Sequence, residues 1–177
     1  RCLISRVRPL PGSAQMDGAM LVQLLRTSVE LGMTFSDKLW TFPAAVPFSS
    51  EEVASLLQAA FSQPTSYATS LFIQRAAQLP ALAELSCSRI AQLMQAAAKQ
   101  YCRDAVNLLQ PLGMVYGAGL VDLCRHSAAQ QLSSEQLLQP LLIVVRCSAE
   151  CTQSLCQLPA AQQLGSEAVA TLLRVAL

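Results

Sequence analysis

The sequence is poor in charge. Charged residues make up only 13% of its 177 residues, about half of the roughly 25% that is usual in a soluble domain. Hydrophobic residues make up 53%, and 18 glutamines supply much of the polar surface. Such a surface is weakly soluble alone, which predicts that other subunits or a nucleic acid cover it. A chain running from Arg1 to Leu177 fits a fragment and a processed mature protein equally well.

A basic excess is also missing. The formal net charge is +1, whereas a free-standing nucleic-acid-binding protein usually carries many more positive than negative charges. This balance argues against a protein that binds nucleic acid by itself. It remains compatible with a subunit that contacts RNA while protein contacts anchor it.

The sequence has neither a long apolar run nor an alternating pattern. The longest nearly uncharged stretch, Leu108–Val121, contains Gln110, Pro111 and three glycines, and it is shorter than the roughly 20 residues that a membrane span needs. Sustained alternation of apolar and polar residues, which is typical of strands, is absent. We therefore expect no transmembrane span and an all-helical fold.

Residues suited to catalysis are scarce. The only histidine, His126, lies two residues from Cys124, a spacing that separates two side chains on a helix. Cys147, Cys151 and Cys156 lack a fourth ligand for zinc. The chain has no phosphate-binding loop, dinucleotide fingerprint or hydrolase motif. We expect no enzyme activity, no cofactor and no small-molecule substrate, and we expect the seven cysteines to be reduced core residues.

The first residues are basic. Arg1, Arg6 and Arg8 precede the first acidic residue, Asp17. This pattern predicts a basic N-terminal arm at residues 1–15, and it is typical of the end of an organellar transit region. It favours a mitochondrial location, with a plastid as the alternative.

One short phrase recurs along the rest of the chain. Its copies begin at Met16, Phe48, Leu85, Leu132 and Leu164. Successive copies are 32, 37, 47 and 32 residues apart, a range typical of stacked helix–turn–helix units. Each copy begins with a large apolar residue followed by Asp, Ser or Gly, the order expected for a hydrophobic staple and an N-cap. The phrase therefore predicts a helix start in every repeat.

Apolar residues follow each start at helical spacing. One column contains Leu21, Val53, Ile90, Leu137 and Val169, and the column four residues later contains Leu25, Leu57, Met94, Leu141 and Leu173. Residues four apart share one face of a helix. Second helices are predicted at Thr65–Leu79, Asp104–Leu112, Leu120–Gln130 and Ala149–Leu158. Pro140 interrupts one copy, which predicts a kink or a displaced helix start there.

These patterns predict a helical repeat domain over residues 16–177, built as a short, irregular α-solenoid. The alternative is an irregular helical bundle. Four phrases, with the Leu pairs that follow them, resemble the degenerate helical repeats of organellar RNA-associated proteins: Phe48-Ser49-Ser50-Glu51, Leu85-Ser86-Cys87-Ser88, Leu132-Ser133-Ser134-Glu135 and Leu164-Gly165-Ser166-Glu167. These are the octotricopeptide and heptatricopeptide types and the repeats before RAP domains in FAST-kinase-like proteins. The resemblance implies an α-solenoid that acts in organellar RNA processing or is part of an organellar ribosome.

Polar positions on the repeated helix suggest where RNA could bind. Two columns three residues apart line one edge of the helix, where hydrogen bonds to bases or phosphates would be made. The candidate RNA-binding residues are Arg26, Gln58, Gln95 and Arg174 on this edge, with Arg1, Arg6 and Arg8 in the arm. The alternative is a solvated or protein-packed edge. We expect a non-catalytic structural subunit of a large organellar ribonucleoprotein, in particular a mitochondrial ribosome, that bridges neighbouring subunits and contacts rRNA. The alternative is a protein-only scaffold subunit of a respiratory or ATP-synthase assembly.

Overall fold

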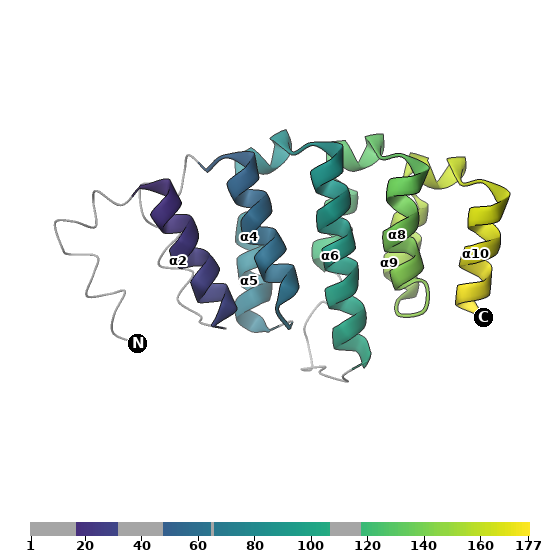
Figure 1. Ribbon diagram of the computed structural model, residues 1–177, viewed down its shortest axis with the longest axis horizontal. Coiled ribbons are helices and arrows are strands. Elements are labelled where there is room, and N and C mark those ends of the chain that lie inside the picture. Colours follow the sequence, from purple (N-terminus) through teal and green to yellow (C-terminus); the bar gives the residue numbers. More distant parts are fainter. Residues whose placement is uncertain (1–16, 32–47, 65, 107–117) are drawn as a thin grey trace. The chain divides into compact units, whose positions relative to one another are not determined.

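A computed structural model describes residues 17–31, 48–64, 66–106 and 118–177. The predicted basic arm with Arg1, Arg6 and Arg8 lies outside these residues. The described residues form α-helices and 3₁₀ helices and contain no strand, which confirms the all-helical class (Figure 1). The chain divides into two compact units between Glu84 and Leu85.

The first unit is built around helix α4. Its elements are α2 (Gly18–Glu30), α4 (Ser50–Ser62), α5 (Tyr67–Ala76) and the 3₁₀ helix η3 (Pro80–Glu84). Helix α4 packs against all three of the others. Leu21, Leu25, Val53, Leu57 and Phe72 form the centre of its core and are fully or almost fully buried.

The second unit has α6 and α8 at its centre. Its elements are α6 (Cys87–Val106), α7 (Ala118–Cys124), η4 (Ser127–Gln131), α8 (Ser134–Val144), α9 (Ala149–Cys156), η5 (Pro159–Gln163) and α10 (Ser166–Ala176). Helices α6, α8 and α10 lie side by side, with α8 in contact with both of the others (Figure 1). Ile90, Met94, Leu137, Leu141 and Leu155 are buried in its core.

The five predicted helix starts are confirmed. Helices α2, α4, α6, α8 and α10 each begin two residues after the first position of the repeated phrase. Ser49 and Ser133 form complete capping boxes, because each serine hydroxyl accepts a hydrogen bond from the third helical N–H and the residue at that position returns one. Such a cap stabilises a helix by about 1 kcal/mol. The recurrence of the phrase therefore has a local physical cause.

The second helices are confirmed in part. Helices α5 and α9 fall within the predicted segments, and the predicted Leu120–Gln130 helix is instead α7 followed by η4. The prediction of a helix start at Asp104 is wrong, because α6 continues without a break to Val106. The predicted displaced start before Pro140 is also wrong, since α8 begins at Ser134 and includes Pro140 as a buried residue.

A 3₁₀ helix precedes each of the three later starts. Elements η3, η4 and η5 end directly before Leu85, Leu132 and Leu164. Two of them share the letters AAQQL, and two begin with Pro. Proline suits the first position of a helix because its fixed φ is already helical and its missing N–H would have no helical partner there. The repeated unit is therefore longer than the phrase alone.

Candidate functional site

The predicted polar edge is largely exposed. Its first column is Gln23, Ser55, Gln92, Gln139 and Thr171, and the second is Arg26, Gln58, Gln95, Leu142 and Arg174. Seven of these ten side chains are exposed, and Gln95, Leu142 and Thr171 are half-buried. The opposite columns are buried in the first four copies of the repeat. Each unit therefore presents a polar edge, which is the geometry that a surface for hydrogen bonds requires.

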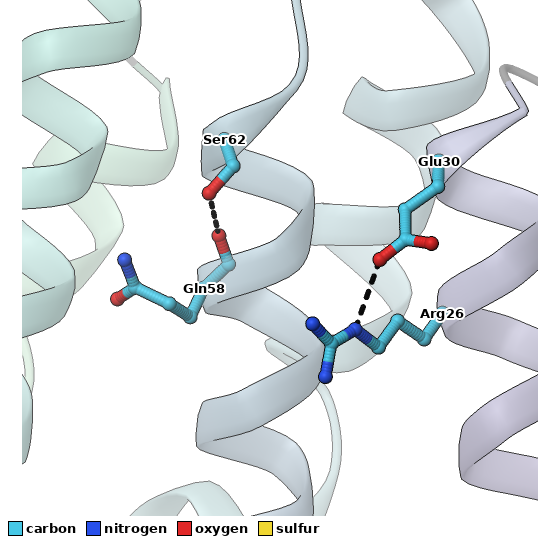
Figure 2. Close-up of polar contacts among 4 residues, drawn as sticks. All are labelled: Arg26, Glu30, Gln58 and Ser62. Atoms are coloured by element: carbon cyan, nitrogen blue, oxygen red, sulfur yellow. Dashed lines mark hydrogen bonds and ion pairs between the residues drawn. The ribbon is translucent and has the colours of Figure 1, made fainter.

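In the first unit the edge carries Arg26 and Gln58. The Nε of Arg26 lies 2.9 Å from Oε1 of Glu30, one helical turn later, in an exposed ion pair (Figure 2). The side chain of Gln58 extends away from Arg26, and its backbone carbonyl accepts a hydrogen bond from the hydroxyl of Ser62 at 2.8 Å (Figure 2). The amide of Gln58 is exposed. Arg26 and Gln58 thus lie on adjacent packed helices but do not form a single pocket.

In the second unit the edge carries Gln95 and Arg174. Gln95 lies near the middle of α6, and Arg174 lies in the last turn of α10, where the helix dipole favours a positive charge. Arg89, one turn before Gln92 on α6, donates from Nη1 to Oε1 of Gln92 at 3.0 Å. This hydrogen bond directs the guanidinium of Arg89 toward Gln92 on the polar edge. Arginine at such a position can bind a phosphate with two parallel hydrogen bonds.

Charge is distributed unevenly along the described chain. Residues 17–31 and 48–84 contain Arg26 and Arg75 as the only basic residues, together with the acidic residues Asp17, Glu30, Glu51, Glu52 and Glu84. The pairing of Arg26 with Glu30 reduces the positive potential further. Attraction of a phosphate backbone depends on such potential. The described part of the first unit is therefore a weak site for nucleic acid, and Arg174 is better placed than Arg26.

Helix α10 exposes an apolar stripe that the sequence analysis did not predict. Val169, Leu173 and Leu177 recur every four residues and are 42%, 59% and fully exposed. None of the residues in α10 is buried. At the same two repeat positions, Leu137 and Leu141 of α8 are at most 1% exposed. The stripe thus has the pattern of a core face but is only partly covered by the described residues, and exposed apolar faces mark sites of association.

A smaller apolar surface lies on α2. Met20 and Leu24 are one turn apart and are 56% and 45% exposed, and Leu31 at the end of the helix is also exposed. Leu56 and Leu93, at the same repeat position as Leu24, are buried. Both surfaces are recognised when the burial of one repeat position is compared between the copies. The sequence alone shows the columns but not which copies have packed neighbours.

His126 has a structural role. Its Nδ1 accepts a hydrogen bond from the backbone N–H of Ala128 at 3.1 Å, and the residue is the N-cap of η4. This geometry uses the lone pair that a neutral imidazole would offer as a general base.

Three cysteines of the second unit, Cys102, Cys124 and Cys151, have raised pKa values. Burial raises the pKa of Cys124 to about 12. Burial, followed by a hydrogen bond to Cys147, raises the pKa of Cys102 to about 12 as well. The pKa of Cys151 is also raised, first by burial and then by the charge of Glu150, against a lowering hydrogen bond from Ser148. Thiols of this kind are held protonated at neutral pH, and a thiol must lose its proton to act as a nucleophile.

The described ranges contain neither a metal-binding cluster nor a membrane span. Within them, no three histidine, cysteine or acidic side chains are grouped so that they could hold a metal ion. Within the same ranges, no helix is both long enough and apolar enough to cross a bilayer. Asp104 is buried on α6, and its Oδ1 lies 3.7 Å from Nε of Arg103.

Comparisons of the chain with family models, with curated proteins and with solved structures find no match. The resemblance to organellar helical repeats therefore stays a prediction that depends on the repeated phrases alone.

Proposed function

We propose that this chain is a non-catalytic structural subunit of a large organellar ribonucleoprotein, in particular a mitochondrial ribosome. Its helix–turn–helix units would stack as a short, irregular α-solenoid, bridge neighbouring subunits and contact rRNA. The observation that carries the proposal is the apolar stripe Val169, Leu173 and Leu177 on α10. Such a stripe next to the polar edge around Arg174 would suit a subunit that is packed among other macromolecules.

The polar edge supplies the RNA part of the proposal. Glutamine and arginine side chains hydrogen-bond to bases and phosphates, and this edge presents both types on exposed helix surface. The low total charge fits a subunit whose affinity comes mainly from protein contacts. RNA binding by the isolated chain is then expected to be weak, and binding within the assembly to depend on the neighbouring subunits.

A protein-only scaffold is the second candidate, and one observation favours it. The described part of the first unit is acidic, and its edge arginine is paired with Glu30. A scaffold in a respiratory or ATP-synthase assembly would need the apolar stripes but no phosphate contacts. The salt dependence of association separates the two candidates, because release of counterions from RNA makes affinity fall steeply with salt.

The first experiment is ultraviolet cross-linking of the native assembly, followed by mass spectrometry of nucleotide-bearing peptides from this chain. Cross-links at residues 1–8 or near Arg26, Gln58, Gln95 or Arg174 are expected. Efficient protein–protein cross-links without any RNA cross-link would refute the RNA part of the proposal.

A matched pair of variants locates the face. Arg174→Gln removes an edge charge, whereas Arg125→Gln removes an exposed charge that is paired with Asp122 at 3.3 Å. We expect the first variant to lower the yield of RNA cross-links and the second to leave it unchanged. Equal effects would contradict a specific contact at the edge.

A further inference from the structure

Two thiols from distant parts of the second unit share one acceptor atom. Cys102 on α6 donates from Sγ to the backbone carbonyl of Ile143 at 3.0 Å. Cys147, in the turn after α8, donates to the same oxygen at 3.7 Å. Cys147 also lies close enough to Cys102 to help raise the pKa of its thiol. Both cysteines are free thiols in the structure.

The helices that carry the pair are packed together. Helices α6 and α8 form the most extensive helix–helix contact in the second unit, and Sγ of Cys102 reaches the backbone of α8 at Ile143, four residues before Cys147. A disulfide requires sulfurs about 2 Å apart on Cβ atoms about 3.5–4.5 Å apart. Two thiols that lie against the same carbonyl oxygen can reach this geometry by side-chain rotation and a small backbone adjustment.

The other cysteines are less suited to pair with Cys102. Cys151 is 1% exposed and donates its backbone N–H to the N-cap Ser148, which holds it within the first turn of α9. Cys156 is exposed on the last turn of α9. Cys102 and Cys147 are both half-buried, so a small oxidant can approach them. The geometry thus singles out one pair.

We propose that Cys102 and Cys147 form a reversible disulfide when the chain meets a low-molecular-weight disulfide such as oxidised glutathione. The bond would tie α6 to the turn between α8 and α9 and lock the packing at the centre of the second unit. This inference is independent of the proposed function, because it rests on side chains inside one unit.

The reaction has two exchange steps. The thiolate of Cys147 attacks one sulfur of oxidised glutathione, forms a mixed disulfide and releases one glutathione thiolate, which takes up a proton from water. Cys102 then loses its proton to water and attacks the sulfur of Cys147, releasing the second glutathione. Two protein thiols are oxidised to one disulfide, and one oxidised glutathione is reduced to two molecules of the thiol form.

The order of the steps follows from burial. Because burial raises the pKa of Cys102 to about 12, its thiolate is scarce at neutral pH. Cys102 therefore serves in the second step, where Cys147 carries the mixed disulfide directly beside it. The rate of this second step is expected to rise about tenfold for each pH unit between 7 and 10, because the thiolate fraction rises tenfold per unit below the pKa.

The test uses the full chain incubated with oxidised glutathione, then digested without reduction and analysed by mass spectrometry. We expect a peptide pair joined through Cys102 and Cys147 and an intact mass lower by two hydrogens. The bond closes a loop of 46 residues, and loops of this size raise the melting temperature by about 5 °C or more. Added dithiothreitol should reverse both changes.

Three variants make the result specific. Cys102→Ser should stop the reaction at one glutathione adduct on Cys147, and Cys147→Ser should abolish the cross-link. Cys156→Ser removes an exposed thiol as the matched control and should leave the cross-link intact. Reduced samples of all three should melt near the wild-type temperature, which shows that they fold. If a variant fails to fold, an alanine at the same position replaces it.

Two outcomes would overturn the proposal. One is a folded wild-type chain that accumulates glutathione adducts without losing two hydrogens. The other is a wild-type cross-link that uses Cys151 or joins two chains through Cys156.

Discussion

Truncation of Leu141 is expected to destabilise the second unit far more than truncation of Leu173. The two leucines occupy the same position of the repeat, on α8 and α10, yet Leu141 is 1% exposed and Leu173 is 59% exposed. Leu→Ala removes three carbon atoms, which at about 0.8 kcal/mol per buried methylene gives about 2.4 kcal/mol before any cavity forms. The cavity raises the expected cost of Leu141→Ala to about 2–5 kcal/mol. Leu173→Ala should change the free energy of unfolding by no more than about 0.5 kcal/mol.

The assay is urea unfolding followed by circular dichroism at the helical band. The midpoint should fall for Leu141→Ala with the slope unchanged, because the area exposed on unfolding is almost the same. Leu173→Ala should superimpose on the wild type. Equal shifts in both variants would refute the reasoning, since they would show that the two positions are equally buried in solution and that the α10 stripe is not an open surface.

Three further changes test the caps and the buried thiols. Ser49→Ala breaks the capping box with Glu52 and should cost about 1 kcal/mol in urea unfolding, whereas Ser55→Ala, at an exposed position of the same helix, should cost at most a few tenths; similar losses would show that the cap is not used. Gly165→Ser should stabilise α10 by a few tenths of a kcal/mol, because Gly165 has the extended backbone of an N-cap, offers no side-chain hydrogen bond and has no atom within 4 Å of an added Cβ; a loss of helical signal would contradict this. Because the pKa of Cys124 is raised to about 12 by burial, from an unfolded value near 9.0, its contribution to stability should be constant below about pH 8.5 and fall as pH rises toward 12; Cys124→Ala should make the fall measured up to pH 10 shallower, with Cys102 and Cys151 responsible for the remainder, Cys156→Ala should leave it as it is, and an unchanged slope in Cys124→Ala would refute the assignment.

The features that the sequence predicted well are those with a local cause. An N-cap and its partner three residues later fix a helix start through contacts within one turn, so the phrase at Ser49 and the phrase at Ser133 each gave the correct first residue. The apolar columns at Leu137 and Leu141 gave the buried face of α8, because spacing alone decides which side chains share a face.

The features that sequence reasoning missed depend on contacts between distant residues. Cys102 and Cys147 meet only because α6 packs on α8, and no spacing rule relates them. The stripe on α10 has the same types of residue as the buried faces of the other repeated helices, and its exposure depends on which helices lie beside it. Pro140 was expected to kink its helix or to displace the helix start, yet the capping box at Ser133 fixes the start, so α8 begins at Ser134 and includes Pro140.

Helix α10 differs from the other repeated helices in its cap, its burial and its packing. It lacks a side-chain cap, buries none of its residues, and makes its most extensive contact with α8. Its main polar tie to the rest of the unit is the hydrogen bond that Nε of Arg146 donates to the carbonyl of Val175. A helix of this length is marginal without packing of its apolar face. The sequence nevertheless keeps Val169, Leu173 and Leu177 on one face, with Glu167 in the first turn and Arg174 in the last, where both charges favour a helix. Such a segment gains most of its stability when another apolar surface covers the stripe.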